Sequence, residues 1–192
     1  MKNTLLKVVA VIAVVLVVAF LFRGNIYRMA VKYEDDGNRK SYDIKDDNLA
    51  KYINQSLPND ESLDTTIDID RIIDLSQEIT TKTLDFSLEA KDSDPQKLIA
   101  TPEANCVGYA AFMAAVGNYL INRFGLNKDW EAKPKKGKLY LLGKDMHKKA
   151  KDGWFKDHDF VVFRNKNTKE EIYADPTVYE YFGVKRVDKY IK

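Results

Sequence analysis

The first strongly patterned stretch of the chain is an apolar run at residues 5–22, in which only Lys7 is charged. A run of this length is what a helix needs to cross the hydrocarbon core of a bilayer. Lys7 is near enough to the start of the run for its long side chain to reach the interface. Because the run continues without a break to Arg23, we expect an uncleaved, single-pass membrane anchor.

A cleaved signal peptide is the alternative interpretation of the same run. It follows a basic start, and Val17 and Ala19 form an acceptable cleavage pattern. An anchor would hold the following domain at a membrane, which we expect to be on the extracytoplasmic side, whereas a cleaved leader would release a secreted protein. Basic residues flank the run on both sides, so the charge distribution does not fix the orientation.

The next stretch, residues 24–65, is mostly polar and charged, and we predict a membrane-proximal linker there. Within it, Leu49, Tyr52 and Ile53 have the spacing of one helical face, so residues 47–56 are predicted to form one short helix.

Helical periodicity then becomes strong. Apolar residues recur at helical spacing from Ile69 to Ile79, which predicts an amphipathic helix that packs on a core. A further helix is predicted to begin at Cys106, and it is apolar on nearly every face. A helix of this kind must be buried, so we expect it at the centre of a domain. Gly125 is expected to end it.

The last third of the chain has short apolar runs typical of strands, at residues 138–142, 158–163 and 171–174. The basic stretch 130–137 contains a proline and a glycine and is interpreted as a loop. Helices followed by strands predict an α+β fold, with an antiparallel sheet packed on the cysteine-bearing helix.

Composition narrows the possible functions. The 192 residues carry a net charge of +2 with acids and bases interspersed, so no basic face indicates a nucleic-acid partner. One cysteine excludes an internal disulfide framework and a cysteine-rich zinc site, and two histidines form no metal cluster with nearby carboxylates. We therefore expect no cofactor and no metal. The expected organisation is an anchor or signal segment at 1–23, a linker at 24–65 and one domain at 66–192.

The single cysteine occupies a position where thiol chemistry is favoured. If Asn105 is the N-cap, Cys106 is the first helical residue. The helix dipole and the unpaired N–H groups there favour a thiolate. A lone cysteine more often fills a core, so a catalytic interpretation requires partner residues.

Candidate partners lie on the last two predicted strands. A turn between Lys166 and Asn167 would set His158 directly opposite Asp175, with their Cβ atoms about 5 Å apart. A slip of one residue would send the two side chains to opposite faces. A carboxylate in this place orients an imidazole, which can then take the thiol proton and return it to a leaving group. The amide of Cys106 would form half of an oxyanion hole.

Each partner also has an ordinary structural interpretation. His158 alone could be a hydrogen-bonded histidine at a strand end, and Asp175 precedes a proline, as turn residues commonly do. The other histidine, His147, lies among charged residues and is interpreted as exposed surface. The cysteine, histidine and aspartate together, in this order, favour catalysis.

Three motifs carry a resemblance to a known family: Asn-Cys106-Val-Gly-Tyr-Ala, Asp-His158-Asp-Phe-Val-Val and Tyr-Ala-Asp175-Pro-Thr. In their order and spacing, over residues 68–183, they resemble the core of the transglutaminase-like superfamily. The resemblance implies a papain-like α+β core with Cys106 as nucleophile, His158 as base and acid, and Asp175 as orienting carboxylate. Two positions depart from the family pattern, which commonly has Gly two residues before the cysteine and Trp two residues after the histidine. This chain has Ala104 and Phe160 there.

The expected function is therefore that of a membrane-anchored, cysteine-dependent acyl-transfer enzyme acting on amide bonds of peptides or proteins. Hydrolysis and transamidation pass through the same acyl-enzyme, so both remain open, and hydrolysis is the narrower expectation because water always competes as acceptor. The alternative is a catalytically inactive transglutaminase-like module that binds or scaffolds partners at the membrane.

Overall fold

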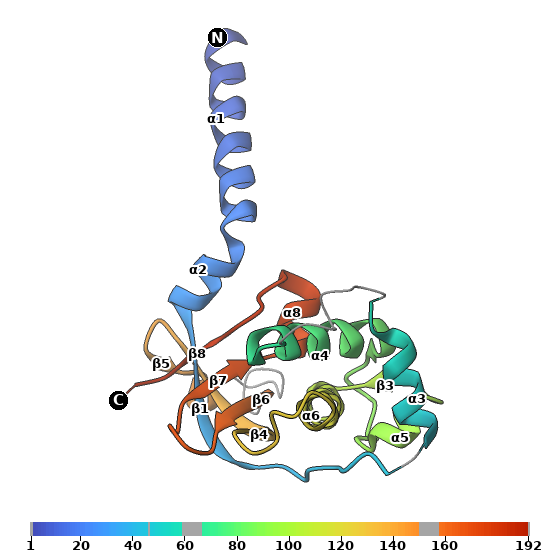
Figure 1. Cartoon of the computed structure of the whole chain (residues 1–192). Coiled ribbons are helices and arrows are strands. Elements are labelled where there is room, and N and C mark those ends of the chain that lie inside the picture. The colour runs from blue at the N-terminus through green and yellow to red at the C-terminus, as the bar shows by residue number, and fades with distance from the viewer. Residues whose placement is uncertain (1, 46, 59–66, 150–157, 192) are drawn as a thin grey trace.

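The computed structural model of the chain describes residues 2–45, 47–58, 67–149 and 158–191, with only the backbone for residues 2–5. Its architecture is α+β (Figure 1). A long N-terminal helix projects from a body in which helices pack against one mixed sheet. The domain boundary expected at residue 66 lies outside the described residues.

The central sheet has the strand order β7-β6-β4-β1-β8, with β5 added beside β4. Its strands are β1 (Val31–Asn38), β4 (Trp130–Leu141), β5 (Lys144–Asp145), β6 (His158–Asn165), β7 (Glu171–Ala174) and β8 (Asp188–Lys189). Neighbouring strands pair antiparallel except β1 and β8, which are parallel. The sheet is therefore mixed, and the purely antiparallel sheet expected from the sequence is wrong. Helix α8 lies between β7 and β8. After it, Val187 forms an isolated antiparallel bridge with Tyr173 of β7, and β8 then pairs in parallel with β1.

The body also contains six helices and a small parallel pair of strands within the described residues. The helices are α3 (Asp47–Ser56), α4 (Ile69–Thr83), α5 (Pro95–Leu98), α6 (Cys106–Arg123), α7 (Met146–Lys149) and α8 (Pro176–Phe182). The strand pair is β2 (Asp85–Phe86) and β3 (Glu103–Ala104). The predicted helices over residues 47–56 and from Ile69 to Ile79 are thus present, the second extended to Thr83.

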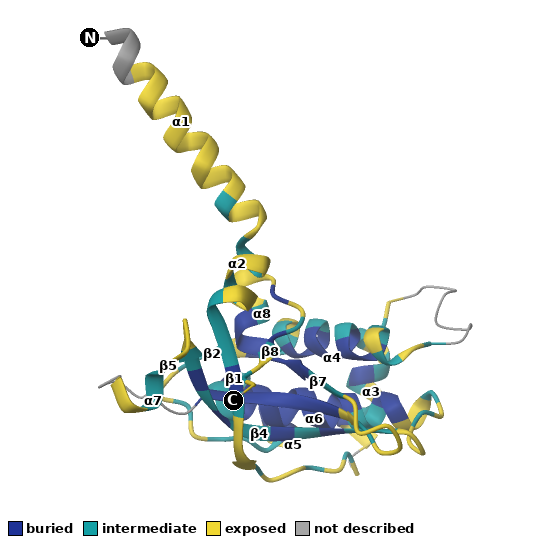
Figure 2. Ribbon diagram, turned by 90° about the vertical axis from the view of Figure 1, so that its left-hand side faces the viewer, coloured by how far each residue is buried: buried dark blue, intermediate teal, exposed yellow. Residues whose placement is uncertain are grey.

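Helix α6 is the centre of the body, as its apolar composition predicts. It packs against β4 and β6 on one side and α4 on another, and Figure 1 views it along its axis. Every residue from Gly108 to Gly117 is buried, which Figure 2 shows as a dark-blue helix. Asn105 is the N-cap and accepts hydrogen bonds from the amides of Val107 and Gly108. Gly125, with φ +75°, follows the end of the helix.

The described parts of the segment 24–65, predicted to be a linker, contribute to the folded body instead. Strand β1 lies inside the sheet between β4 and β8, and Tyr33 on it is fully buried. Helix α3 buries Leu49 and Ile53 in the main core. The linker prediction failed because strand β1 is rich in charge, and the partners of those charges lie about one hundred residues away.

The same pairing explains why residues 130–137 form a strand and not the expected loop. Asp35 on β1 pairs with Lys135 on β4 at 2.6 Å, and Asp36 pairs with Lys138 at 2.5 Å. Each strand looks polar by itself, but opposite charges across a strand pair stabilise the sheet. Pro134, which has no N–H to donate, lies just beyond the last residue pair between β1 and β4.

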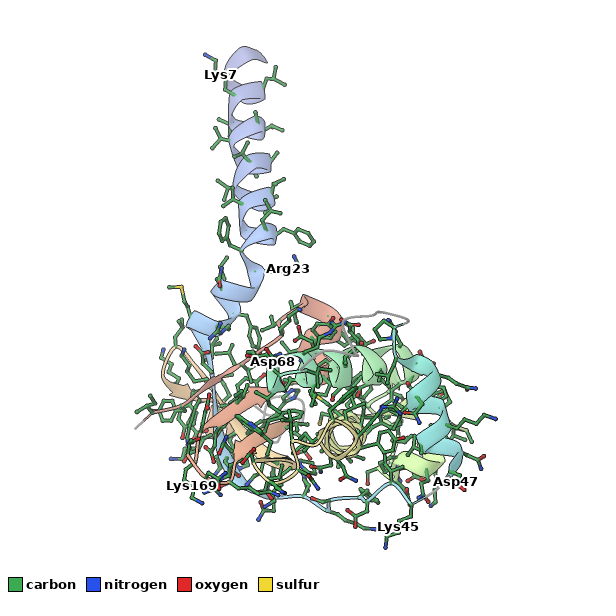
Figure 3. All side chains as sticks on the ribbon, in the orientation of Figure 1. Lys7, Arg23, Lys45, Asp47, Asp68 and Lys169 are labelled. Atoms are coloured by element: carbon green, nitrogen blue, oxygen red, sulfur yellow. The ribbon has the colours of Figure 1, made fainter. Side chains whose placement is uncertain are left out.

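The N-terminal apolar run forms α1 (Lys2–Leu21), followed by α2 (Arg23–Ala30) after a 70° bend. Its apolar side chains project into solvent along the described part of α1, as the sticks in Figure 3 show. Among the described residues no single helix has both the length and the apolar character to cross a membrane. Helices α1 and α2 meet that test only when taken together as a bent pair.

Candidate active site

The three residues singled out by the sequence lie at the ends of three different elements. Cys106 is the first residue of α6, His158 is the first residue of β6, and Asp175 follows β7 directly and is the N-cap of α8. Element ends leave backbone groups without partners inside the element. Side chains at these ends can turn toward a neighbouring element.

The hairpin of β6 and β7 has a different register from the one expected. Val161 faces Ala174, whereas the expected turn would have set Val161 against Ile172. The shift is two residues, and a shift of two keeps every side chain on its expected face. His158 and Asp175 are therefore not directly opposite, but their side chains still meet. The Nε2 atom of His158 lies 2.5 Å from Oδ2 of Asp175.

The carboxylate of Asp175 is fully buried, and both of its oxygens accept hydrogen bonds. Its Oδ1 accepts hydrogen bonds from the Thr177 hydroxyl at 2.6 Å and from the Thr177 and Val178 amides at 3.0 and 3.1 Å. Burial by itself raises the pKa of Asp175, but the charge of His158 and these hydrogen bonds outweigh it and hold the pKa below its ordinary value of 3.8. Asp175 thus stays ionised while capping α8.

His158 is nearly as buried, with 4% of its surface exposed. Burial lowers the pKa of His158, but the charge and hydrogen bond of Asp175 outweigh burial, and the pKa lies above its ordinary value of 6.5. A raised pKa makes the imidazole a stronger base. Because Nε2 is bonded to Asp175, any proton exchange of this imidazole with a reacting group would have to involve the other ring nitrogen, Nδ1.

Two tyrosines that the sequence analysis did not identify extend this chain of hydrogen bonds. The Tyr33 hydroxyl donates to Oδ2 of Asp175 at 2.7 Å, and it lies 2.6 Å from the Tyr27 hydroxyl. Burial, followed by the charge of Asp175, raises the pKa of Tyr33 well above its usual range, so this hydroxyl remains a donor. Both tyrosines lie in the segment predicted to be a linker, which is why they were missed. Val31 and Tyr33 are two residues apart, as apolar residues on one face of a strand are, and this spacing was the signal in the sequence that could have indicated β1.

Cys106 lies at the start of α6 and is partly exposed. Burial raises the pKa of the Cys106 thiol, the backbone N–H of Asp159 lowers it, and the carboxylates of Asp159 and Asp175 raise it again. The net shift is upward, whereas the helix dipole alone predicted a favoured thiolate. In the resting protein, burial and two nearby carboxylates therefore outweigh the helix N-terminus.

Asp159, the residue after His158, is held in place by an ion pair. Asp159 is fully buried, and Arg39, just after β1, holds both of its carboxylate oxygens at 2.7 and 3.0 Å. This bidentate pair fixes the start of β6, where the backbone N–H of Asp159 lowers the pKa of the Cys106 thiol. Arg39 and Asp159 thus connect β1 to both candidate catalytic elements.

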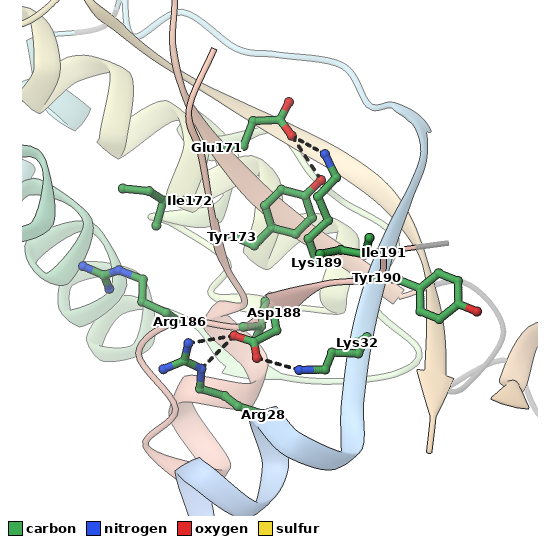
Figure 4. A pocket seen from close by; sticks show the side chains of 11 residues that line it. Arg28, Lys32, Glu171, Ile172, Tyr173, Arg186, Asp188, Lys189, Tyr190 and Ile191 are labelled. Carbon is green, nitrogen blue, oxygen red and sulfur yellow. Dashed lines mark hydrogen bonds and ion pairs between the residues drawn. The ribbon is translucent and has the colours of Figure 1, made fainter. Parts of the chain in front are cut away.

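One surface pocket lies away from the three candidate residues. A pocket of about 640 Å³ lies over β7 and β8, and none of the three candidates is among its described lining residues. Figure 4 shows that Arg28 and Lys32 both bind Asp188, and that Lys189 binds Glu171. Among the described residues, no three His, Cys, Asp or Glu side chains come together in a way that could hold a metal ion.

Comparisons with protein-family models, with curated proteins and with solved structures find no match to this chain.

Proposed function

We propose that this chain is a cysteine-dependent acyl-transfer enzyme that attacks amide bonds of peptides or proteins, with Cys106 as nucleophile, His158 as base and acid, and Asp175 as orienting residue. The observation that carries the proposal is the buried hydrogen bond from His158 to Asp175, together with a cysteine at a helix N-terminus that is near enough to Asp175 for this carboxylate to raise the pKa of the thiol. The order of its motifs supports a transglutaminase-like, papain-like core.

The proposed reaction uses each group in one role. Nδ1 of His158 takes the thiol proton as Sγ of Cys106 attacks the carbonyl carbon, and Asp175 stabilises the imidazolium that forms. The imidazolium then protonates the leaving amine, which departs and leaves a thioester on Cys106. Water or a second amine next attacks the thioester and passes a proton back through His158 to the sulfur. The Asn105 side chain holds the amides of Val107 and Gly108, so the amide of Cys106 is the one at the start of α6 that would donate to the developing oxyanion.

The raised pKa of the Cys106 thiol is compatible with this scheme, because the nucleophile need not be a thiolate at rest. His158 has a raised pKa and can accept the proton during attack, as in general-base catalysis. The exposed apolar surface of α1 supports attachment of the enzyme to a membrane.

The test is the rate of Cys106 alkylation by iodoacetamide between about pH 5 and pH 10, a range that spans histidine and cysteine titration. Cys106 is the only thiol in the chain. We expect His158→Ala to slow alkylation near pH 7 by about tenfold or more, because the buried thiol then lacks a base. The matched control is His147→Ala, which removes the only other histidine and should leave the rate unchanged.

A second candidate function is a binding module that keeps the fold without catalysis. The observation that favours it is the upward pKa shift of the partly buried Cys106 thiol. Slow alkylation at every pH, equally slow in His158→Ala and His147→Ala, would support the binding module and contradict the enzyme.

A further inference from the structure

A cavity of about 210 Å³ adjoins His158. It lies among α2, α8, α7 and the adjoining ends of β1 and β4, beside the smaller core cluster that contains Tyr33 and Phe160. Its apolar lining residues are Val31, Leu139, Leu141, Met146, Val178 and Phe182. The space is partly open to solvent, because its lining residues Leu141, Tyr181 and Phe182 are exposed.

The side chains that line the cavity determine which kind of ligand it can hold. Among the described lining residues, His158 carries the only imidazole, and no carboxylate or ammonium is present. Two of the hydroxyls in the wall are already engaged, Tyr27 with Tyr33 and Thr177 with Asp175. An apolar space of this kind favours an uncharged apolar group over an ion or ordered water.

The position of the cavity assigns it to one side of the reaction. In thiol acyl transfer the acyl carbon is bonded to sulfur, whereas the amine nitrogen must approach the imidazole that exchanges its proton. His158 lines the cavity and Cys106 does not. A substrate group that occupies the cavity would therefore be a substituent on the amide nitrogen.

We propose that this cavity is the amine-side subsite of the enzyme, and that it takes one uncharged apolar group about the size of a large side chain. The proposal rests on the proposed function, and it names the substrate class as amides whose nitrogen carries a bulky apolar residue. The volume is below the roughly 300–1,000 Å³ of sites that hold a whole drug-sized ligand, which agrees with a single side chain.

The first experiment measures binding without chemistry. A series of N-alkylacetamides from ethyl to dodecyl is titrated into the full-length protein in detergent, and the His158 imidazole resonances are followed by NMR in a His147→Ala background. Affinity should rise about fourfold for each added methylene, and then level off at about octyl when the cavity is full. Affinity independent of chain length, or still rising at dodecyl as for a lipid chain, would overturn the proposal.

A matched pair of variants tests whether the alkylacetamides bind in this cavity. Leu141 lines the cavity and its neighbour Leu142 does not, while both are exposed enough, at 41% and 75%, for a polar replacement. Leu141→Asp should weaken N-hexylacetamide binding at least tenfold, because it puts a carboxylate in the wall. Leu142→Asp should leave binding unchanged. Equal losses in the two variants would contradict a site in this cavity.

The second experiment tests the amine side. Cys106 is acetylated with 4-nitrophenyl acetate, and the thioester is then released by n-alkylamines, so that the S–C bond breaks as the N–C bond forms. Release by hexylamine should exceed release by ethylamine about tenfold or more, and Leu141→Asp should abolish the difference. Equal release by both amines would overturn the amine-side assignment. Failure of acetylation together with normal alkylacetamide binding would instead contradict the proposed function while leaving an apolar ligand site.

Discussion

The hydroxyl of Tyr33 donates a 2.7 Å hydrogen bond to Oδ2 of Asp175, the same oxygen that lies 2.5 Å from Nε2 of His158. Tyr33 comes from β1, whereas Asp175 and His158 belong to the C-terminal hairpin and its flanking helix. One carboxylate oxygen is thus shared by a group from the N-terminal part of the chain and by the candidate base. The position of the base therefore depends on β1 being in the sheet.

Tyr33→Phe tests this dependence. The variant removes one donor from a buried carboxylate, and a hydrogen bond to a charged group contributes about 1.5–3 kcal/mol. We expect the free energy of unfolding in urea to fall by about 2 kcal/mol, and the pKa of Asp175 to rise toward its ordinary value. Tyr27→Phe is the comparison, because Tyr27 contacts Tyr33 but does not bond Asp175. An equal loss in both variants would contradict a specific role for the Asp175 contact.

Asp175→Asn tests the pair of His158 and Asp175 through pH. The folded pKa of Asp175 is lowered below 3.8, so its stabilisation is present above that pH and is lost as pH falls through the folded pKa. The folded pKa of His158 is raised above 6.5, so its stabilisation is complete below 6.5 and is lost as pH rises through the folded pKa. The difference in free energy of unfolding between the unaltered protein and Asp175→Asn should therefore be largest between about pH 4 and pH 6.5.

The Asp175→Asn measurement is urea unfolding at a series of pH values, together with an NMR titration of His158. In the variant the pKa of His158 should fall below its value in the unaltered protein, because burial remains while the carboxylate charge is gone. Asn can still accept the amides of Thr177 and Val178 through its carbonyl oxygen, so α8 keeps its cap. A stability difference that is constant from pH 3 to pH 9, across both titrations, would contradict the ionic pair.

Arg39→Met should destabilise the protein by removing the partner of a fully buried carboxylate. Breaking such a pair costs about 3–5 kcal/mol, and we expect about 3 kcal/mol because the Arg39 side chain is one-third exposed. The double variant Arg39→Met/Asp159→Leu should recover most of this loss, since no charge is then left unpaired. Urea unfolding of the single and double variants measures the difference. No recovery in the double variant would show that Arg39 acts through packing instead.

Gly137→Ala should disturb the start of β6. Gly137 pairs with His158 across the sheet, and a Cβ atom there would collide with the Phe160 ring and lie 2.8 Å from the His158 carbonyl oxygen. We expect a loss of about 1–3 kcal/mol in unfolding free energy and a slower His158-dependent alkylation of Cys106. Gly24→Ala is the control, because its nearest contact would be Val184 at 3.9 Å. Comparable losses at both glycines would refute the crowding argument.

The sequence by itself determined the local elements of this protein. The spacing of apolar residues predicted α3, α4 and α6, and the short strand-like runs matched β6 and β7. The Asn105 cap, the position of Cys106 at the start of α6 and the end of that helix near Gly125 were also predicted. These features depend on side chains within one or two turns of each other, so the local pattern is enough to specify them.

Tertiary structure alone decided how distant segments complete the site. Strand β1 looks like a charged linker because the lysines that balance Asp35 and Asp36 lie on β4. The register of β6 and β7 differed by two residues from the prediction, and His158 still reached Asp175 because a shift of two preserves the face. The Tyr33 contact, the burial that raises the Cys106 pKa and the cavity beside His158 all arise from residues far apart in the chain. No local pattern encodes these features, because each depends on which surfaces the whole fold removes from water.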